Sequence, residues 1–421
     1  MLTIQTLRSN PEYVKQRLAI KNFKELDLID TIIAKDEERR ATKTKVEELQ
    51  FRMNIVAKEI GALIAQNKND EASIQKTKTA VLKLEINELT EKLQLLDSEQ
   101  ETLLLSLPNL PHSTVPIGNF ANDNVIVKAT PYPTLMPGAL SHWDLAKKHD
   151  LIDFDLGTKV SGAGFPFYKG KGAKLQRALI AMFLDAAIAS GYIEYQPPLM
   201  VNASSARGTG QLPDKEGQMY HAVADDLYLI PTAEVPLTNI YRDVIIEEKE
   251  LPIKLTGYSQ CFRREAGSYG KEVRGLNRLH QFDKVEIVQI THPEKSYEAL
   301  DTMVDHVENV LVSLELPYRI LRLCGGDMSF AGALTYDFEV YSAAQERWLE
   351  VSSLSCFETF QSNRMQMRIR GKDKKNILAH TLNGSALALP RIVAALLENH
   401  QDPEGIKIPR SLHSYTGFER I

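Results

Sequence analysis

The sequence predicts an α+β protein, in which an antiparallel two-helix coiled-coil arm precedes a domain built on an antiparallel sheet with flanking helices. Two observations carry this prediction. Residues 32–107 contain one glycine and no proline, and they repeat apolar residues at spacings of three and four, as long helices do. Residues 261–290 and 336–353 instead alternate apolar and polar residues, which indicates strands. The 421 residues suffice for two or three domains.

Composition excludes several classes of protein. The hydrophobic share of 43% and the charged share of 25% are ordinary for a soluble globular protein. A net charge of −5 gives no global positive field, so any RNA contact must come from local basic patches. Cys261, Cys324 and Cys356 lie far apart, which argues against a disulfide framework or a cysteine zinc site. We see no signal peptide and no membrane span, and therefore expect a cytoplasmic location.

The N-terminal region is expected to be helical. A short helix should open with Ser9 or Asn10 as its cap and Pro11 in its first turn. Two longer helices of about 50 Å each should then pack through one apolar seam apiece. The polar run at 67–70 supplies the turn between them. The seam residues are Val46, Leu49, Met53, Val56, Ile60 and Leu63 in the first helix, and Leu82, Ile86, Leu89, Leu93, Leu96 and Leu103 in the second, which also carries the polar Gln100.

Prolines at 108, 111 and 116 end the second long helix. We expect residues 108–135 to form a linker and residues 136–421 to form the second domain. That domain begins with a helix over 172–190, which Gly191 should stop. A strand-like run interrupted by Pro197 and Pro198 follows. From the residues alone, this helix and strand indicate core packing.

Polar residues follow a predicted buried strand at 227–230. Thr232, Ala233 and Glu234 lie at its exit, where sites are often built in sheet enzymes. The same residues would also suit the cap of a following helix, and the pattern alone leaves both readings open.

The most informative stretch is 261–290, which predicts a hairpin around a glycine-bearing loop at 266–275. Alternation places Arg263 and Glu265 on one face of the first strand, and Phe282 and Glu286 on one face of the second. A guanidinium that binds phosphate, a ring that stacks on a base and a carboxylate that holds an amine suit a nucleotide and an amino compound. Any one of these residues could instead simply face water.

The remaining segments add further candidates. Residues 294–316 predict an amphipathic helix, with His292 and His306 at the surface. Glu350 and Ser353 offer oxygen ligands of the kind Mg²⁺ prefers, although a lone strand carboxylate is usually only solvated. A basic stretch is either a solvated face or an RNA contact, and consists of Arg364, Arg368, Arg370, Lys372, Lys374 and Lys375. Residues 383–385 precede a helix in which Arg391 lies one to two turns from the start, near a natural phosphate site.

FRREAG (262–267) and RGLNRLHQFDKVE (274–286) closely resemble motif 2 of class II aminoacyl-tRNA synthetases, in the form found in seryl-tRNA synthetases. The helix and strand ending near Pro198 resemble motif 1, which forms the dimer interface, and residues 380–401 resemble motif 3. Ala386 and Pro390 depart from the glycines of some members, at what we expect to be the start of a helix. The resemblance covers nearly the whole chain and implies a class II synthetase-like sheet domain that activates L-serine with ATP and charges tRNA(Ser), with tRNA(Sec) left open.

The resemblance also implies roles for individual residues, with Arg263 and Arg391 as catalytic residues. The serine-binding residues it implies are Thr232, Ala233, Glu234, Arg263, Glu286, Asn383 and Ser385. The implied ATP-binding residues are Arg263, Arg264, Glu265, Phe282, Glu350, Val351, Ser352, Ser353 and Arg391, of which Glu350 and Ser353 would also hold Mg²⁺.

The helical hairpin of 1–107 alone most resembles a dimerisation or spacer coiled coil, but the resemblance makes it an arm that binds the tRNA. The side chains that would then meet phosphate are Arg39, Arg40, Lys43, Lys45, Arg52, Lys58, Lys76 and Lys78. Three rivals remain: a threonyl or prolyl synthetase, a ligase that charges a carrier protein, and a scaffold that has lost catalysis. The missing zinc ligands and editing domain count against the first, and the long arm counts against the second. The third is disfavoured because Arg263, Glu286 and Arg391 are all present.

Overall fold

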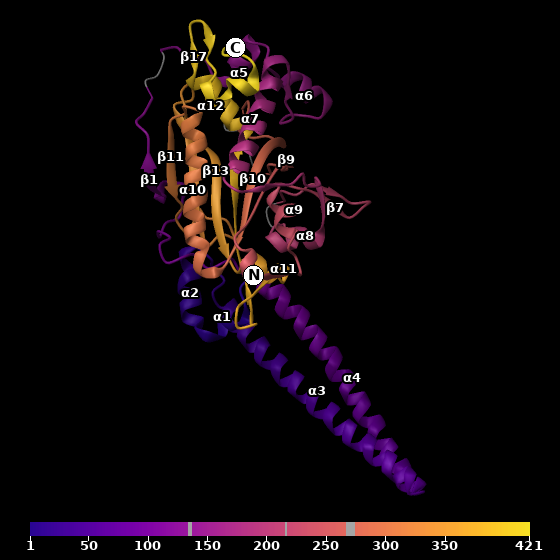
Figure 1. Cartoon of the computed structure of the whole chain (residues 1–421). Helices are drawn as coiled ribbons and strands as arrows, with labels where there is room; N and C mark the ends of the chain where they lie inside the picture. Colours follow the sequence, from indigo (N-terminus) through magenta and orange to yellow (C-terminus); the bar gives the residue numbers. More distant parts are fainter. Residues whose placement is uncertain (134–136, 215–216, 267–273) are drawn as a thin grey trace. The chain divides into compact units, whose positions relative to one another are not determined.

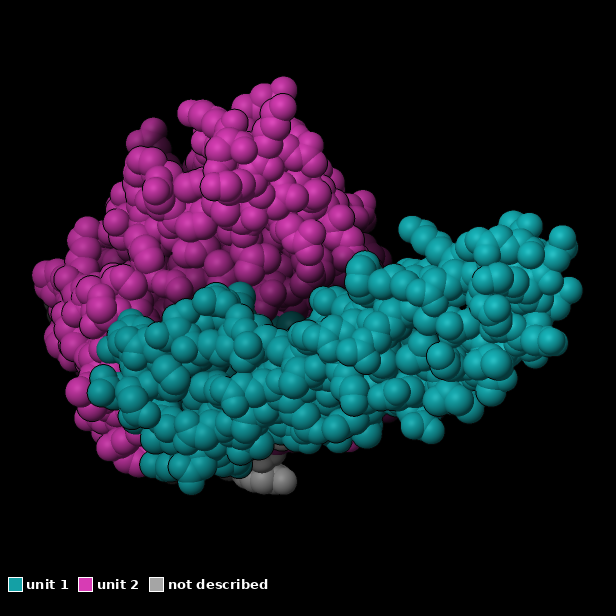
Figure 2. Space-filling view, turned by 90° about the horizontal axis from the view of Figure 1, so that it is seen from below, with its two compact units in different colours: residues 1–19, 23–108 teal, residues 20–22, 109–421 magenta. Residues whose placement is uncertain are grey.

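The computed structural model describes residues 1–133, 137–214, 217–266 and 274–421. The chain divides into two compact units. One consists of Met1–Ala19 and Phe23–Pro108, and the other of Ile20–Asn22 and Asn109–Ile421, as the two colours of Figure 2 show. Within the described residues, no helix is both long enough and apolar enough to cross a membrane.

The first unit is entirely helical (Figure 1). Its helices are α1 (Ile4–Ser9), α2 (Pro11–Ile20), α3 (Leu28–Ala65) and α4 (Asn69–Ser106). The last two contain 38 residues each and pack side by side, which confirms the predicted hairpin. Val46, Leu49, Ile86 and Leu96 are buried in the seam between them. Near its end the seam buries Leu104 and leaves the predicted Leu103 only half-buried.

A buried carboxylate joins the helices at one end of this hairpin. Asp36 of α3 accepts hydrogen bonds from Gln100 of α4 at 3.2 Å, from Arg40 at 2.9 Å and from Arg8 at 3.2 Å. The Asp36 side chain is 2% exposed. The polar residue in the predicted seam is therefore matched by a polar partner, as burial of an amide requires.

The second unit is organised by an eight-stranded sheet of order β1-β11-β12-β13-β16-β10-β9-β4. All pairs are antiparallel except β4 with β9. The strands, in that order, are Val125–Ala129, Tyr318–Arg322, Leu334–Ser342, Arg347–Glu358, His380–Ala388, Gln281–Thr291, Ile253–Phe262 and Ile193–Glu194. The edge strand β1 comes from the segment expected to be a linker.

Three helices cover one face of this sheet: α7 (Gly170–Ala189), α10 (Ser296–Ser313) and α12 (Leu389–Asn399) (Figure 1). Together with the sheet they enclose the main core, which includes Phe183, Val307 and Phe338. His306 of α10 was expected at the surface, and this expectation is wrong. Its side chain faces α7, is 8% exposed, and shares a hydrogen bond of 3.1 Å with Ser190.

Shorter elements complete the second unit. The small sheets are β5 (Met200–Asn202), β7 (Leu227–Leu229) and β6 (His221–Ala222); β8 (Ile245–Glu247), β14 (Arg368–Arg370) and β15 (Asn376–Leu378); β2 (Ile152–Asp153) and β3 (Phe167–Tyr168); and β17 (Gln401–Asp402) and β18 (Gly405–Ile406). The further helices are α5 (His142–Lys148), α6 (Phe154–Val160), α8 (Ala203–Thr209), α9 (Glu234–Asn239), α11 (Phe360–Met365) and α13 (His413–Thr416).

The basic stretch does not form a single solvated face. Arg364 donates to the backbone oxygens of Arg207 and Leu212, and burial lowers its pKa to about 10. Arg370 pairs with Glu247 at 3.2 Å. These two arginines hold neighbouring segments together, because the fold places acceptors around them that lie far away in the sequence.

Candidate active site

The sheet face opposite the main core carries a row of polar residues. Asp337 of β12 stands opposite Ser353 of β13, and Ser385 of β16 stands opposite Glu286 of β10. Leu354 of β13 pairs with Gly384 of β16, which places Ser353 opposite Ser385. Directly opposed residues share a face of the sheet, so all four lie on one surface. The row ends at Gly257 of β9, where a Cβ would lie 2.7 Å from the Tyr195 oxygen.

A buried triangle of side chains lies at the Glu286 end of this row. Thr232 donates a hydrogen bond of 2.9 Å to Glu286, and Lys284 donates one of 2.7 Å to Thr232 while it forms an ion pair with Glu286. Thr232 also accepts a hydrogen bond from the Glu234 backbone at 3.2 Å. Thr232 therefore joins the backbone at the start of α9 to the sheet.

A second carboxylate, Glu234, is buried beside Glu286. Burial and the Glu286 charge raise the pKa of Glu234 to about 7, against the opposing effects of Gln361, Lys284 and Asn383. Gln361 donates to Glu234 at 2.7 Å. Lys284 pairs with Glu286 and not with Glu234, so this group of two buried carboxylates and one lysine can take one more positive charge, such as an ammonium group.

Arg263 lies next to this group of residues. Its guanidinium lies 5.3 Å from the centre of the Phe282 ring, and its Nε donates to the Pro231 oxygen at 3.4 Å. Because Pro231 directly precedes Thr232, Arg263 contacts the segment whose Thr232 hydroxyl donates to Glu286. The guanidinium and the ring therefore form a cation–π contact.

The strand that leads to Arg263 is shorter than predicted. It ends at Phe262, and Glu265 has a left-handed φ of +50°. The expectation that Arg263 and Glu265 share a strand face is therefore wrong. Glu265 instead accepts a hydrogen bond from Arg278 at 3.1 Å, and the Arg264 guanidinium lies 5.9 Å from the Tyr220 ring.

A β-bulge brings Glu350 and Ser353 together. Phe338 pairs with Ser352, but the next residue, Glu339, pairs with Glu350, so Val351 is the extra residue. An extra residue reverses the alternation of faces. Glu350 and Ser353 are three positions apart and would otherwise point to opposite faces. Asp337, opposite Ser353, has its pKa raised by burial and by the Glu350 charge.

Arg391 lies in the first turn of α12 and not one to two turns in. Residues 383–386 form part of β16, so Ala386 does not belong to the start of a helix as expected. The pairing of β16 with β10 is irregular near Leu387, whose φ is +92°, and the chain turns into α12 there. Arg391 donates from Nε to the Asn277 oxygen at 3.1 Å and from Nη1 to the Glu350 oxygen at 2.5 Å.

The structure therefore brings together most of the predicted site residues. Lys284 and Gln361 were missed. Lys284 could have been found, because it shares the alternating face of Phe282 and Glu286, whereas no local pattern marks Gln361. Residues 267–273 of the predicted hairpin loop lie outside the described residues.

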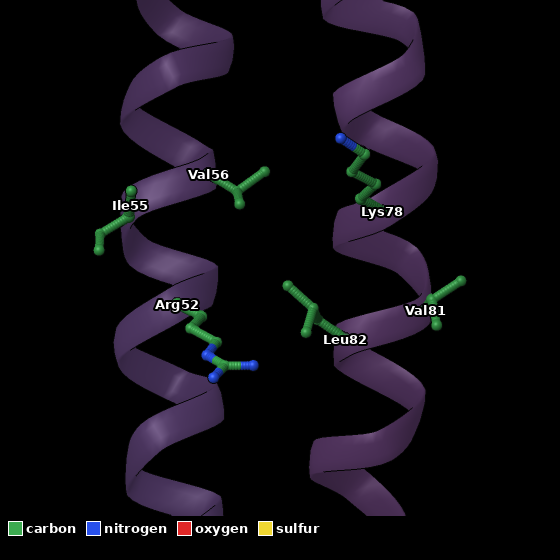
Figure 3. A pocket seen from close by; sticks show the side chains of 6 residues that line it. All are labelled: Arg52, Ile55, Val56, Lys78, Val81 and Leu82. Carbon is green, nitrogen blue, oxygen red and sulfur yellow. The ribbon is translucent and has the colours of Figure 1, made fainter.

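The helical arm carries a separate surface feature. A groove of about 470 Å³ between α3 and α4 is lined by Arg52, Ile55, Val56, Lys78, Val81 and Leu82. Figure 3 shows Val56 and Leu82 pointing between the two helices, with Lys78 across from Val56 and Arg52 across from Leu82. Lys45 is paired with Glu85 and Arg39 with Asp97, so part of their charge is already balanced.

A family model described as the tRNA synthetase class II core domain (G, H, P, S and T) matches residues 220–400, and one described as the seryl-tRNA synthetase N-terminal domain matches residues 1–111. The chain is 53% identical over 425 residues to the serine–tRNA ligase of Salinibacter ruber, with 100% of this chain and 99% of that protein covered. The chain belongs to the seryl-tRNA synthetase family. As a member of it, the protein is an enzyme, a class II serine–tRNA ligase.

The chain is also similar to other seryl-tRNA synthetases over its full length. The serine–tRNA ligase of Neisseria meningitidis serogroup C is 46% identical, with 99% of this chain and 98% of that protein covered. The structure of the Pyrococcus horikoshii seryl-tRNA synthetase, described as complexed with ATP, superimposes with a TM-score of 0.93 at 33% identity, and covers 100% of this chain and 99% of that one. A Giardia lamblia prolyl-tRNA synthetase covers 65% of this chain and 56% of its own, with a TM-score of 0.57 at 14% identity, and shares only the fold.

Proposed function

We propose that this protein activates L-serine with ATP to form seryl-adenylate and then transfers the seryl group to tRNA(Ser). The arrangement of Thr232, Lys284 and Glu286 carries the proposal. It places buried hydrogen-bonding groups beside Glu234 and next to the guanidinium of Arg263. Such a pocket suits a small amino acid that bears both a charged ammonium and a hydroxyl.

We assign serine to the polar end of the row. Glu234 receives the ammonium group, because a cation completes the charge balance of two carboxylates and one lysine. Glu286 and Thr232 bind the hydroxyl, and a pocket built to hydrogen-bond that hydroxyl should reject alanine, which lacks it, by about 10⁴-fold or more. The further contacts come from Ala233, Asn383 and Ser385, which surround the same pocket.

We assign ATP to the neighbouring part of the face. Arg263 binds the α-phosphate and the serine carboxylate, and Phe282 stacks on the adenine. Glu265 and Arg264 bind at the adenine end, Val351 and Ser352 line the bulge, and Arg391 binds the γ-phosphate. The P. horikoshii relative, described as complexed with ATP, supports this assignment.

We propose that Glu350 and Ser353 hold Mg²⁺. The donors fit this ion, because Mg²⁺ prefers oxygen ligands and takes the rest from phosphates and water. Asp337 adds to the fit, since its Oδ1 is buried without a hydrogen-bond partner in the part of the chain that the structure describes. Within that part, no three His, Cys, Asp or Glu side chains form a metal cluster, which suits an ion completed by substrate. When bound, Mg²⁺ neutralises phosphate charge.

The chemistry follows from positioning and charge. The serine carboxylate, held by Arg263, attacks the α-phosphorus in line, and the bond to pyrophosphate breaks. Arg263 stabilises the charge that develops on the α-phosphate, and Arg391 holds the departing pyrophosphate. In the second step the ribose hydroxyl at the tRNA terminus attacks the serine carbonyl and AMP leaves. We assign no residue as the base for this transfer.

We propose that the arm binds the tRNA through the groove between α3 and α4. Arg52 and Lys78 line it, and both have no ion-pair partner among the described residues. Cations without such a partner neutralise phosphate at the lowest cost. Lys58 and Lys76 have the same property, so these four rank above Arg39, Arg40, Lys43 and Lys45. Because this reading does not involve the anticodon, the proposal extends to tRNA(Sec).

We propose that the protein forms a homodimer through the segment that follows α7. Ile193 is 61% exposed, and Tyr195, Leu199 and Met200 are each 37% exposed. They lie on and beside β4, an edge strand, and a row of exposed apolar residues at a sheet edge indicates an interface. Light scattering should give the mass of two chains.

Pyrophosphate exchange into ATP tests the central proposal. Exchange should depend on serine, and threonine, proline and alanine should not replace it. Exchange that any of those amino acids supports as well as serine would overturn the assignment of the pocket. Charging assays with tRNA(Ser) and tRNA(Sec) then test the second step.

A further inference from the structure

A fully buried histidine–carboxylate pair lies beside the proposed ATP site. His142 of α5 and Glu398 of α12 are both 0% exposed in their side chains. The Glu398 carboxylate accepts from the His142 backbone N–H at 3.0 Å and from its Nδ1 at 2.7 Å. Two bonds to one carboxylate oxygen fix both the position and the orientation of the imidazole ring.

The other ring nitrogen identifies the tautomer. The backbone N–H of Leu276 donates to His142 Nε2 at 2.9 Å. A backbone amide can only donate, so Nε2 must be the unprotonated nitrogen and Nδ1 must carry the hydrogen. Glu398 therefore selects the tautomer that lets His142 accept from the chain at Leu276.

A second chain of hydrogen bonds runs from Glu398 to Asn277, the residue after Leu276. The Gln345 amide donates to Glu398 at 3.4 Å, and its oxygen accepts from the Asn277 side chain at 3.0 Å. Ser342 also donates to the carboxylate. The two paths end on Leu276 and Asn277, so Glu398 holds two consecutive residues of the chain after the motif 2 loop.

The chain passes very close to the imidazole at this point. A Cβ on Gly275 would lie 2.3 Å from His142 Nε2 and 3.0 Å from Trp143, and Gly275 has a φ of +65°. The Arg274 guanidinium lies 4.6 Å from the centre of the Trp143 ring. His142 and Trp143 thus form the surface on which residues 274–276 rest.

The held segment in turn holds Arg391. The Asn277 oxygen accepts from Arg391 Nε at 3.1 Å. Arg391 and Glu398 lie on the same helix, α12, seven positions or about two turns apart. Glu398, near the end of α12, therefore holds the chain at Asn277. Asn277 in turn orients Arg391, near the start of the same helix.

We propose that His142 and Glu398 are positioning residues for ATP: they fix the backbone at 276–277, which aims the Arg391 guanidinium at the terminal phosphate. This inference rests on the assignment of Arg391 to ATP above. Neither residue reaches the pocket of Thr232 and Glu286, so the pair affects ATP binding and leaves serine binding unchanged.

Glu398→Gln tests this inference. The His142 backbone N–H and Nδ1–H both donate to one Glu398 oxygen, so a glutamine can match them only with its carbonyl oxygen. Its NH2 then opposes the Ala344 N–H at the other position, and the negative charge that holds the imidazole is lost. We expect the Kd and KM for ATP to rise about tenfold or more, as misplaced binding groups do, while the KM for serine changes little. His142→Leu should do the same, and His142→Gln, which restores an acceptor, should partly rescue it.

The matched control is His400→Gln, next to the end of the same helix, where Nε2 meets the Leu314 oxygen at 3.0 Å. It should leave the Kd for ATP unchanged. If Glu398→Gln does not fold, Gly275→Ala displaces the same segment from the imidazole and should show the same loss for ATP alone. Equal losses for ATP and serine, or none, would overturn the inference. Calorimetric ATP binding reports this even if serine-dependent exchange is absent, so the two failures are distinguishable.

Discussion

Thr232 donates a hydrogen bond of 2.9 Å to Glu286, although 54 positions separate them in the chain. This bond joins the exit of a short strand to the centre of the main sheet. Lys284 donates to the same hydroxyl, so the Thr232 O–H must point toward Glu286 and donate to it. The hydroxyl therefore has a fixed direction before any substrate arrives, and the pocket is organised in advance.

Serine binding should depend on the ionisation of Glu234. Its pKa is raised to about 7, so in the empty site it is protonated below that pH and must release its proton to meet an ammonium. The Kd for serine should therefore weaken about tenfold from pH 8 to pH 6, since the affinity follows the ionised fraction. Calorimetry in buffers of different ionisation enthalpy should detect the released proton.

Glu234→Gln is the control, because it should bind serine more weakly but with no pH dependence over the same interval.

The effect of Glu234 ionisation on stability has the opposite sign to that of an ordinary carboxylate. A folded-state pKa raised from 4.5 to about 7 means that the contribution of Glu234 to the free energy of unfolding falls as pH rises through that interval. Wild-type affinity that does not vary with pH would rule out Glu234 as the ammonium partner.

Arg263→Ala should lower the rate of serine-dependent exchange by about 10²–10³-fold, or 3–4 kcal/mol, as the loss of one preorganised donor does. Arg263→Lys should recover only part, because a single ammonium cannot bind two oxygens in the manner of a guanidinium. Both rates come from the same exchange assay, with the melting temperature as a check on folding. An unchanged rate for Arg263→Ala would remove this residue from the mechanism.

Much of this architecture could be predicted from sequence, and particular residues show where prediction stopped. The seam residues Val46 and Ile86 were found, because helical periodicity is local. Glu350 could be proposed only from the resemblance, since alternation alone sends it away from Ser353. The bulge at Val351 depends on how two strands pair. The His142–Glu398 pair joins residues 256 positions apart, and no local pattern encodes such a contact.

Asp337→Asn should weaken Mg²⁺ binding without disturbing the sheet. The amide keeps the shape of the carboxylate beside Ser353 but removes a charge that would otherwise favour a cation. With Mn²⁺ as the probe and ATP present, electron paramagnetic resonance should show affinity reduced by about 10–100-fold. Glu339→Gln, on the same strand but paired with Arg319, is the control and should bind Mn²⁺ normally. Equal affinity in Asp337→Asn and the wild type would show that Asp337 does not support the ion.

Charge reversal in the arm groove should separate the two half-reactions. Arg52→Glu and Lys78→Glu should each raise the KM for tRNA about tenfold or more, because each removes a phosphate contact. The double variant should raise this KM further. Serine-dependent exchange should stay at the wild-type rate, since the adenylate forms without tRNA. Lys83→Glu makes the same charge change on α4 outside the residues that line the groove, and should have little effect. A tRNA KM that rises equally in all three variants would assign binding to the overall charge of the arm and not to this groove.

Asp36→Ala should destabilise the helical arm more than any exposed change on it. The substitution leaves Gln100 buried without its partner and removes the only acceptor that both Arg8 and Arg40 share among the described residues. Breaking a buried ionic contact on one side costs about 3–5 kcal/mol. Hydrogen exchange should therefore show faster opening of α3 and α4, while serine-dependent exchange stays unchanged. Asp36→Asn, which still accepts from Gln100, should lose about half as much, and equal losses for both variants would mean that the charge alone stabilises this end of the hairpin.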